Sequence, residues 1–201
     1  MRTKVLVLTT LWLLVCAFAL TDVGHAKNSS VVKTAVEAEL TPCCGGPEPG
    51  AEGEAARTTL KKNGVTQIDR FKGEVTVPVD PSSALGITDE TAAAAADIRL
   101  IFSRGGNPYA ECFLVLAEIE TEEEEGALVT EAEYKVDVRQ RLTNGTTVLQ
   151  EVRGTCDTDL GTLGIQAGIP DVQAGDVATA RLVLPSPPGP LDFLQGTFVA
   201  Q

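Results

Sequence analysis

The sequence predicts an all-β fold, and an antiparallel β-sandwich is the architecture we expect. Three observations indicate it: apolar and polar residues alternate with period two, turn dipeptides separate the alternating segments, and the sequence shows no amphipathic helix of useful length. In a strand, successive side chains point to opposite faces, so alternation gives one buried and one solvated face. Strands at this spacing fit a jelly-roll or an immunoglobulin-like topology, and the sequence leaves that choice open.

The clearest alternation runs over 132–138, and 75–79 and 98–102 repeat it. The stretch 112–117 is apolar at every position, which suits a central strand buried on both faces. The alanine-rich stretch 91–96 is expected to form one helical turn, because alanine is the best helix former. The strands are expected near 31–40, 56–62, 65–79, 96–103, 109–120, 131–142, 146–156, 177–184 and 191–200.

Turn dipeptides connect these strands, and Asn63-Gly64 is a typical hairpin signal. At the second such signal, Asn144-Gly145, a two-residue loop would pair Val138 with Glu151 and mix the two faces. A three-residue loop would pair apolar residues of both strands instead. We therefore predict a bulged turn with Gly145 in the left-handed region.

A faint internal repeat in the sequence suggests that the domain has two similar halves. Leu85-Gly86-Ile87 precedes an Ala-rich stretch and the strand segment 99–102, and Leu163-Gly164-Ile165 precedes a similar segment at 181–184. Either the domain consists of two similar half-sandwich repeats, or strands and turns resemble each other by coincidence.

Residues 1–26 are expected to be a signal peptide, with a basic start, an apolar run over 5–20 and small residues at Gly24 and Ala26 before the cleavage site. The apolar run is shorter than the roughly 20 residues of a membrane-spanning helix, so cleavage is favoured over anchoring. Residues 27–55 would form an N-terminal strand and a partly disordered linker rich in Gly, Pro and Glu at 45–54. Residues 56–201 would form a single all-β domain. The predicted localisation is secreted or periplasmic, without membrane contact after cleavage.

The chain carries 16 basic and 28 acidic residues, a net charge of −12. The basic residues are scattered along the sequence, whereas binding to nucleic acid needs clustered Lys and Arg. We therefore expect no nucleic-acid partner, and instead a cation or an unidentified protein with a basic surface. The only histidine, His25, lies in the predicted signal peptide, which excludes Ser-His-Asp and Cys-His catalysis in the mature chain.

Four cysteines remain after the signal peptide: Cys43, Cys44, Cys112 and Cys156. An oxidising compartment favours two disulfides. We expect Cys43 and Cys44 each to reach a distant partner, because a bridge between adjacent residues strains the backbone. The alternative is a direct bridge between Cys112 and Cys156.

Calcium is the one cofactor for which the sequence offers candidates. Asp157 and Asp159 lie two residues apart in a loop that contains glycine, and Asp171 and Asp176 follow in the same connection. Calcium takes its ligands from carboxylate and carbonyl oxygens, so these four aspartates are the predicted metal ligands. The alternative is turn formation, in which an aspartate accepts hydrogen bonds from its own backbone.

The predicted function is a non-enzymatic binding or structural module that contacts its partner through edge strands and the loops 80–95 and 157–176. A calcium-dependent adhesion module is the first alternative. A carboxylate-based hydrolase is the second, and it would need two acids in one concave pocket, at least one with a raised pKa.

Overall fold

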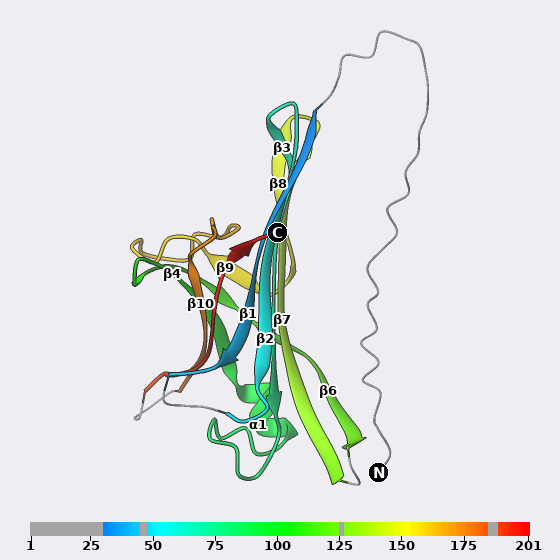
Figure 1. Cartoon of the computed structure of the whole chain (residues 1–201), viewed down its shortest axis with the longest axis vertical. Coiled ribbons are helices and arrows are strands. Elements are labelled where there is room, and N and C mark those ends of the chain that lie inside the picture. The colour runs from blue at the N-terminus through cyan, green and yellow to red at the C-terminus, as the bar shows by residue number, and fades with distance from the viewer. Residues whose placement is uncertain (1–29, 45–47, 125–126, 185–188) are drawn as a thin grey trace, which may run out of the picture.

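The computed structural model describes residues 30–44, 48–124, 127–184 and 189–201. The predicted signal peptide lies outside the described residues, as do 45–47 of the predicted linker. The described chain forms one antiparallel sheet that curls into a half-barrel, with a single short helix (Figure 1). The all-β prediction is confirmed, whereas neither sandwich topology is.

The elements follow one another along the chain with these bounds: β1 (Val31–Pro42), β2 (Glu52–Lys62), β3 (Val65–Pro78), α1 (Glu90–Ala95), β4 (Asp97–Arg104), β5 (Asn107–Phe113), β6 (Val115–Glu124), β7 (Ala127–Thr143), β8 (Thr146–Arg153), β9 (Thr155–Asp157), β10 (Val177–Val183), β11 (Leu191–Thr197) and β12 (Val199–Ala200).

The curled sheet has two halves. The first half has the order β6-β7-β3-β2-β1 and contains the long upright strands of Figure 1, and the second has the order β11-β10-β4-β5-β9. They meet where the end of β1 pairs with β11, at Thr41↔Gln195 and Pro42↔Leu194. Strand β8 pairs with the second part of β7, and β12 pairs with β1.

The core lies between the two halves, whose inner faces contact each other. The rings of Phe71 on β3 and Phe102 on β4 meet edge to face, with centroids 5.2 Å apart. Gly73 of β3 faces Leu100 of β4 across the core, and an added Cβ at Gly73 would lie 2.4 Å from the Leu100 Cδ1 atom. A side chain at position 73 would therefore require the Leu100 side chain to shift.

Helix α1 is the helical turn predicted at 91–96. Asp89 caps its first turn by accepting a hydrogen bond from the Ala92 N–H at 2.8 Å. The Tyr134 hydroxyl of β7 donates to the Ala93 carbonyl at 2.7 Å. The helix is thereby attached to the first half of the sheet.

Both Asn-Gly dipeptides form two-residue hairpin loops, with positive φ at Asn144 (51°) and Gly145 (78°). The left-handed Gly145 is confirmed, but the three-residue loop is wrong, because β8 pairs Val138 with Glu151. The bulge lies further along the strand, between Asp137 and Val138. The side chains of β8 are almost all exposed, so pairing its apolar residues with those of β7 would bury no additional apolar surface.

Two predicted strands, 109–120 and 146–156, each break where the chain crosses between the halves, at Leu114 and Gly154. Gly154 has φ +64°, and a Cβ there would lie 2.3 Å from the Phe113 carbonyl oxygen. The continuous buried strand expected over 112–117 is therefore wrong, and Val115 is 42% exposed.

The disordered linker expected over 45–54 is not found in its described part. Glu48 is only 4% exposed, and its carboxylate accepts hydrogen bonds from the Leu85 N–H at 3.1 Å and the Ser83 hydroxyl at 3.0 Å. Strand β2 begins directly afterwards, at Glu52. These hydrogen bonds hold the segment in place, although it has few apolar side chains that could pack into the core.

The internal repeat is not confirmed. Leu85 and Ile87 are buried, whereas Leu163 is 100% exposed and Ile165 is exposed too. Strands β4 and β10, which contain the two similar segments, are neighbours in one half of the sheet instead of equivalent strands of separate halves.

Candidate functional site

The face of the first half that is turned away from the core holds a concentration of basic side chains. Phe71 and Val138 point into the core, so their chain neighbours point outward. Cross-strand pairing brings Arg70 beside Arg139, and Lys72 beside Asp137. The residues of this basic face, as we call it, are Lys33, Lys62, Arg70, Lys72, Arg139, Arg141 and Arg153.

Few acids lie near the basic face in the described strands. Asp137 lies among its residues, and Glu37 lies at its border on β1. The Arg70 Nε atom donates to Asp137 Oδ1 at 2.8 Å, and this hydrogen bond lowers the pKa of Asp137. Seven of the 16 basic residues, which are scattered along the sequence, thus share one surface because they occupy outward-facing positions on neighbouring strands.

The other end of the same outer face is acidic. Neighbouring positions on β1, β2 and β3 bring Glu39, Glu54 and Glu74 into one row. A groove of about 1210 Å³ runs along these strands. Its acidic lining residues are Glu37, Glu39, Glu52, Glu54 and Glu74.

Glu74 forms a carboxylate pair with Glu133 of β7. Burial, followed by a hydrogen bond to Glu133 and the charge of Glu133, raises the pKa of Glu74 to about 7. Burial acts to raise the pKa of Glu133 too, but hydrogen bonds from Glu74 and Lys135 lower it overall. The Lys135 Nζ lies 2.5 Å from Glu133 Oε1 and favours the ionised form of Glu133, so below about pH 7 a protonated Glu74 faces an ionised Glu133.

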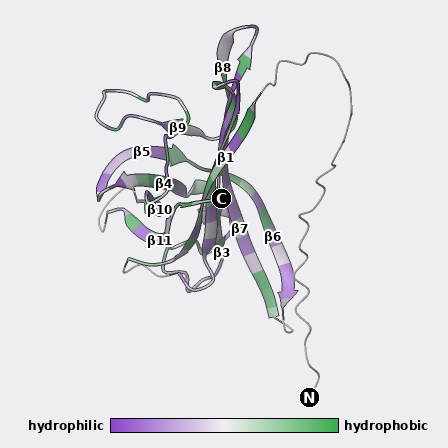
Figure 2. Ribbon diagram, turned by 45° about the horizontal axis from the view of Figure 1, so that its top comes forward, coloured by the Kyte–Doolittle hydropathy of each residue, from purple (hydrophilic) through white to green (hydrophobic). Residues whose placement is uncertain are grey.

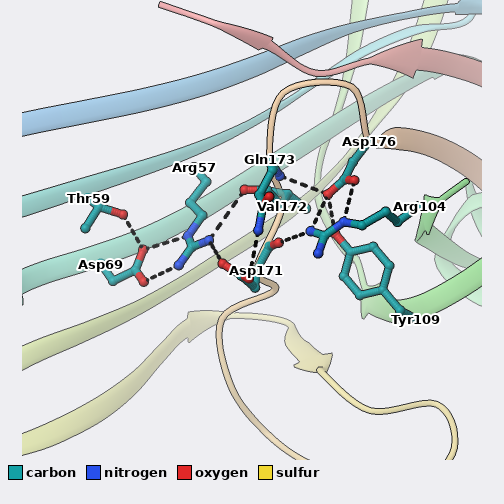
Figure 3. Close-up of polar contacts among 9 residues, drawn as sticks. All are labelled: Arg57, Thr59, Asp69, Arg104, Tyr109, Asp171, Val172, Gln173 and Asp176. Atoms are coloured by element: carbon teal, nitrogen blue, oxygen red, sulfur yellow. Dashed lines mark hydrogen bonds and ion pairs between the residues drawn. The ribbon is translucent and has the colours of Figure 1, made fainter.

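A polar network ties the loop before β10 to the rest of the sheet (Figure 3). Asp176, whose side chain is 4% exposed, accepts from Arg104 Nε at 2.8 Å and from the Tyr109 hydroxyl at 2.9 Å. The hydrogen bond from Arg104 is the main cause that lowers the pKa of Asp176. The Gln173 N–H also donates to Asp176, so each oxygen has a partner within the fold.

The same network continues to Arg57 on β2. Its guanidinium donates to both oxygens of Asp69, at 3.0 and 2.8 Å, and to Asp171 at 2.5 Å. A polar pocket of about 340 Å³ lies beside it on the inner side of the sheet. Its polar lining residues are Thr34, Arg57, Thr59, Lys61, Thr66, Asp69, Asp171 and Gln173. Opposite charges of this network neutralise each other, which indicates a structural role.

The four aspartates predicted to bind calcium separate into two groups. Asp157 accepts from the backbone N–H groups of Asp159 and Gln166, and Asp159 accepts from Gly161, while Asp171 and Asp176 pair with arginines. Among the residues that the structure describes, no three His, Cys, Asp or Glu side chains could together hold a metal ion. Calcium binding stays a prediction, which melting curves with calcium and with EDTA would test.

The cysteines form two disulfides, Cys43–Cys44 and Cys112–Cys156. Our expectation that Cys43 and Cys44 reach distant partners is therefore wrong, and the alternative bridge between Cys112 and Cys156 is present. Those two residues lie opposite each other on β5 and β9, with Cα atoms 4.0 Å apart. This direct cross-strand pair leaves no distant partner for Cys43 or Cys44.

No known protein family, no curated protein and no solved structure matches the chain. In the described ranges, no helix has the length and apolar character that crossing a membrane requires. The two disulfides are consistent with an oxidising compartment.

Proposed function

We propose that this protein is a secreted or periplasmic, non-enzymatic binding module that holds an acidic polysaccharide on its basic face. The observation that supports this is the grouping of seven basic side chains on five neighbouring strands, in a chain of net charge −12. Strands lie about 4.8 Å apart, so the face is roughly 19 Å wide and can contact several sugar units.

The acidic end of the sheet does not cancel this local positive field. On β3, Glu74 lies two residues from Lys72, about 7 Å at 3.4 Å per residue, and four residues from Arg70, about 14 Å. The Debye length is about 8 Å at physiological ionic strength, so Arg70 and the basic residues beyond it are screened from Glu74, whereas Lys72 is not. An anionic chain on the basic face is therefore attracted locally although the protein as a whole is acidic.

The chemistry of the face favours a polysaccharide over nucleic acid. Four of its residues are arginines, and a planar guanidinium binds carboxylate and sulfate groups with two parallel hydrogen bonds. Arg70 already pairs in this way with Asp137, which leaves Arg139, Arg141 and Arg153. The aromatic residues on these five strands, Phe71 and Tyr134, are buried in the core and do not reach this face, whereas single-stranded nucleic acid is held largely by stacking on aromatic rings.

Charge reversal tests the proposal, with a control on the same strand. Lys62 points outward on the basic face, and its neighbour Lys61 lines the pocket on the opposite face. We expect Lys62→Glu to elute from immobilised heparin, used as a sulfated polysaccharide, at lower NaCl concentration than the parent, and Lys61→Glu to elute close to it. Arg141→Glu should act like Lys62→Glu.

Equal elution of both lysine variants would contradict the proposal, since a non-specific charge effect does not distinguish the two faces. Retention on immobilised single-stranded DNA without retention on heparin would reject the polysaccharide and point to nucleic acid.

A second candidate function is a carboxylate-based hydrolase, and the Glu74–Glu133 pair favours it. Glycosidases use one protonated and one ionised carboxyl group, and Glu74, which lines the acidic groove with a pKa of about 7, lies beside an ionised Glu133. Hydrolysis of a polysaccharide panel, assayed by release of reducing ends, should then be lost in both Glu74→Gln and Glu133→Gln. An inactive parent protein would reject this candidate.

A further inference from the structure

The disulfide between Cys43 and Cys44 lies at the junction of the two halves of the sheet. It follows directly after the short ladder between β1 and β11, and the Cys43 N–H donates to the Phe193 carbonyl at 2.9 Å. Cys43 is partly exposed and Cys44 is exposed. A reductant in solution can therefore reach this bond in the folded protein.

The backbone at this bridge is constrained. Cys44 has φ +68°, in the left-handed region that residues with a side chain rarely adopt. Opening the bond releases this constraint, and strained, exposed disulfides are the ones that are readily reduced.

The second disulfide provides an internal contrast. Cys112 and Cys156 are both fully buried in the core. Their bridge spans 44 residues and joins two paired strands, so its reduction requires opening of the core. The two disulfides of one molecule thus differ in exposure and in backbone constraint.

We propose that Cys43–Cys44 is a redox site that accepts two electrons from a dithiol while Cys112–Cys156 stays oxidised. A thiolate of the dithiol attacks Sγ of Cys44, forms a mixed disulfide and releases the Cys43 thiolate. The second thiol of the dithiol then attacks the mixed disulfide and displaces the Cys44 thiolate, so that the reagent leaves as a cyclic disulfide. The two protons that the dithiol loses end on the Cys43 and Cys44 thiols.

The reduced site is a pair of adjacent thiols, which is a ligand set for soft ions. Thiolate sulfur selects thiophilic species over hard cations such as calcium. The reduced protein is therefore expected to bind a trivalent arsenical through both sulfurs, and the oxidised protein is not.

Differential labelling tests the proposal on the purified protein. Pre-existing thiols are blocked, the folded protein is treated with increasing dithiothreitol, and new thiols are labelled and assigned by peptide mass spectrometry. We expect Cys43 and Cys44 to become labelled at a dithiothreitol concentration at least about tenfold lower than Cys112 and Cys156, equivalent to a difference in potential of roughly 30 mV. After mild reduction, phenylarsine oxide should add in a 1:1 ratio.

The variant Cys43→Ser/Cys44→Ser is the control, and it should neither be labelled nor bind the arsenical at those concentrations. Reduction of both disulfides at the same dithiothreitol concentration would overturn the proposal. So would a disulfide that links Cys43 or Cys44 to Cys112 or Cys156 in the untreated protein, or the absence of an arsenical adduct.

Discussion

Removing the buried disulfide with Cys112→Ala/Cys156→Ala should lower the free energy of unfolding strongly. The bridge spans 44 residues, and the chain-entropy relation for a loop of that length gives roughly 4 kcal/mol at 25 °C. Both cysteines are fully buried, so the loss of their packing lowers the free energy of unfolding further. For a domain of this size, 1 kcal/mol shifts Tm by about 2–4 °C, so we expect a decrease of roughly 8–16 °C.

The matched control is Cys43→Ala/Cys44→Ala, which removes a bridge with a sequence separation of 1. Closing so short a loop constrains the unfolded chain little, and the same relation gives less than about 1 kcal/mol. Urea unfolding followed by far-UV circular dichroism would measure both variants. If the two double variants lose the same stability, or if the first loses less than about 1 kcal/mol, the reasoning from loop length is refuted.

Three further changes probe the pKa values and the backbone. Asp176→Asn should cost about 1–3 kcal/mol at pH 7, because it removes the negative charge and one of the two carboxylate oxygens that accept from Arg104. Because the folded pKa of Asp176 is lowered, its contribution is present above about pH 4 and lost as the pH falls through the folded value, so the variant's acid unfolding should depend less on pH. Glu74 has a raised pKa of about 7, so stability should fall as the pH rises from about 4 to 7, and melting curves of Glu74→Gln should lack this fall. Gly154→Ala should lower Tm far more than Gly64→Ala, since both have positive φ but only the Gly154 Cβ would meet backbone; equal shifts would contradict this account.

Local sequence patterns predicted the individual strands well. The period-two segments around 75–79, 98–102 and 132–138 all lie in strands, and both Asn-Gly dipeptides form the loops that their left-handed preference favours. The acidic run 122–124 belongs to β6, whose outer end is hydrophilic in Figure 2. Antiparallel pairing with β7 holds these glutamates in a strand despite their low strand propensity.

The candidate site was harder to predict, because its residues come from five strands. The alternation places Arg70, Lys72 and Arg139 on the solvated side of their strands, and that signal was available in the sequence. What it did not contain was the register that sets Arg70 beside Arg139 and Arg153 beside Asp137. The aspartates show the reverse case, because spacing in the loop indicated metal ligands but Arg57 and Arg104, distant in sequence, pair with two of them.

The sequence by itself determined the all-β class, the positions of most strands and of the two Asn-Gly turns, and the absence of histidine after residue 26. These features depend on residues close along the chain, through side-chain alternation and turn geometry. Only the tertiary structure decided the single curled sheet, the partner of each cysteine and the basic face. These depend on contacts between distant segments, such as Gly73 against Leu100 and Cys112 against Cys156, where packing selects one pairing among several that are locally equivalent.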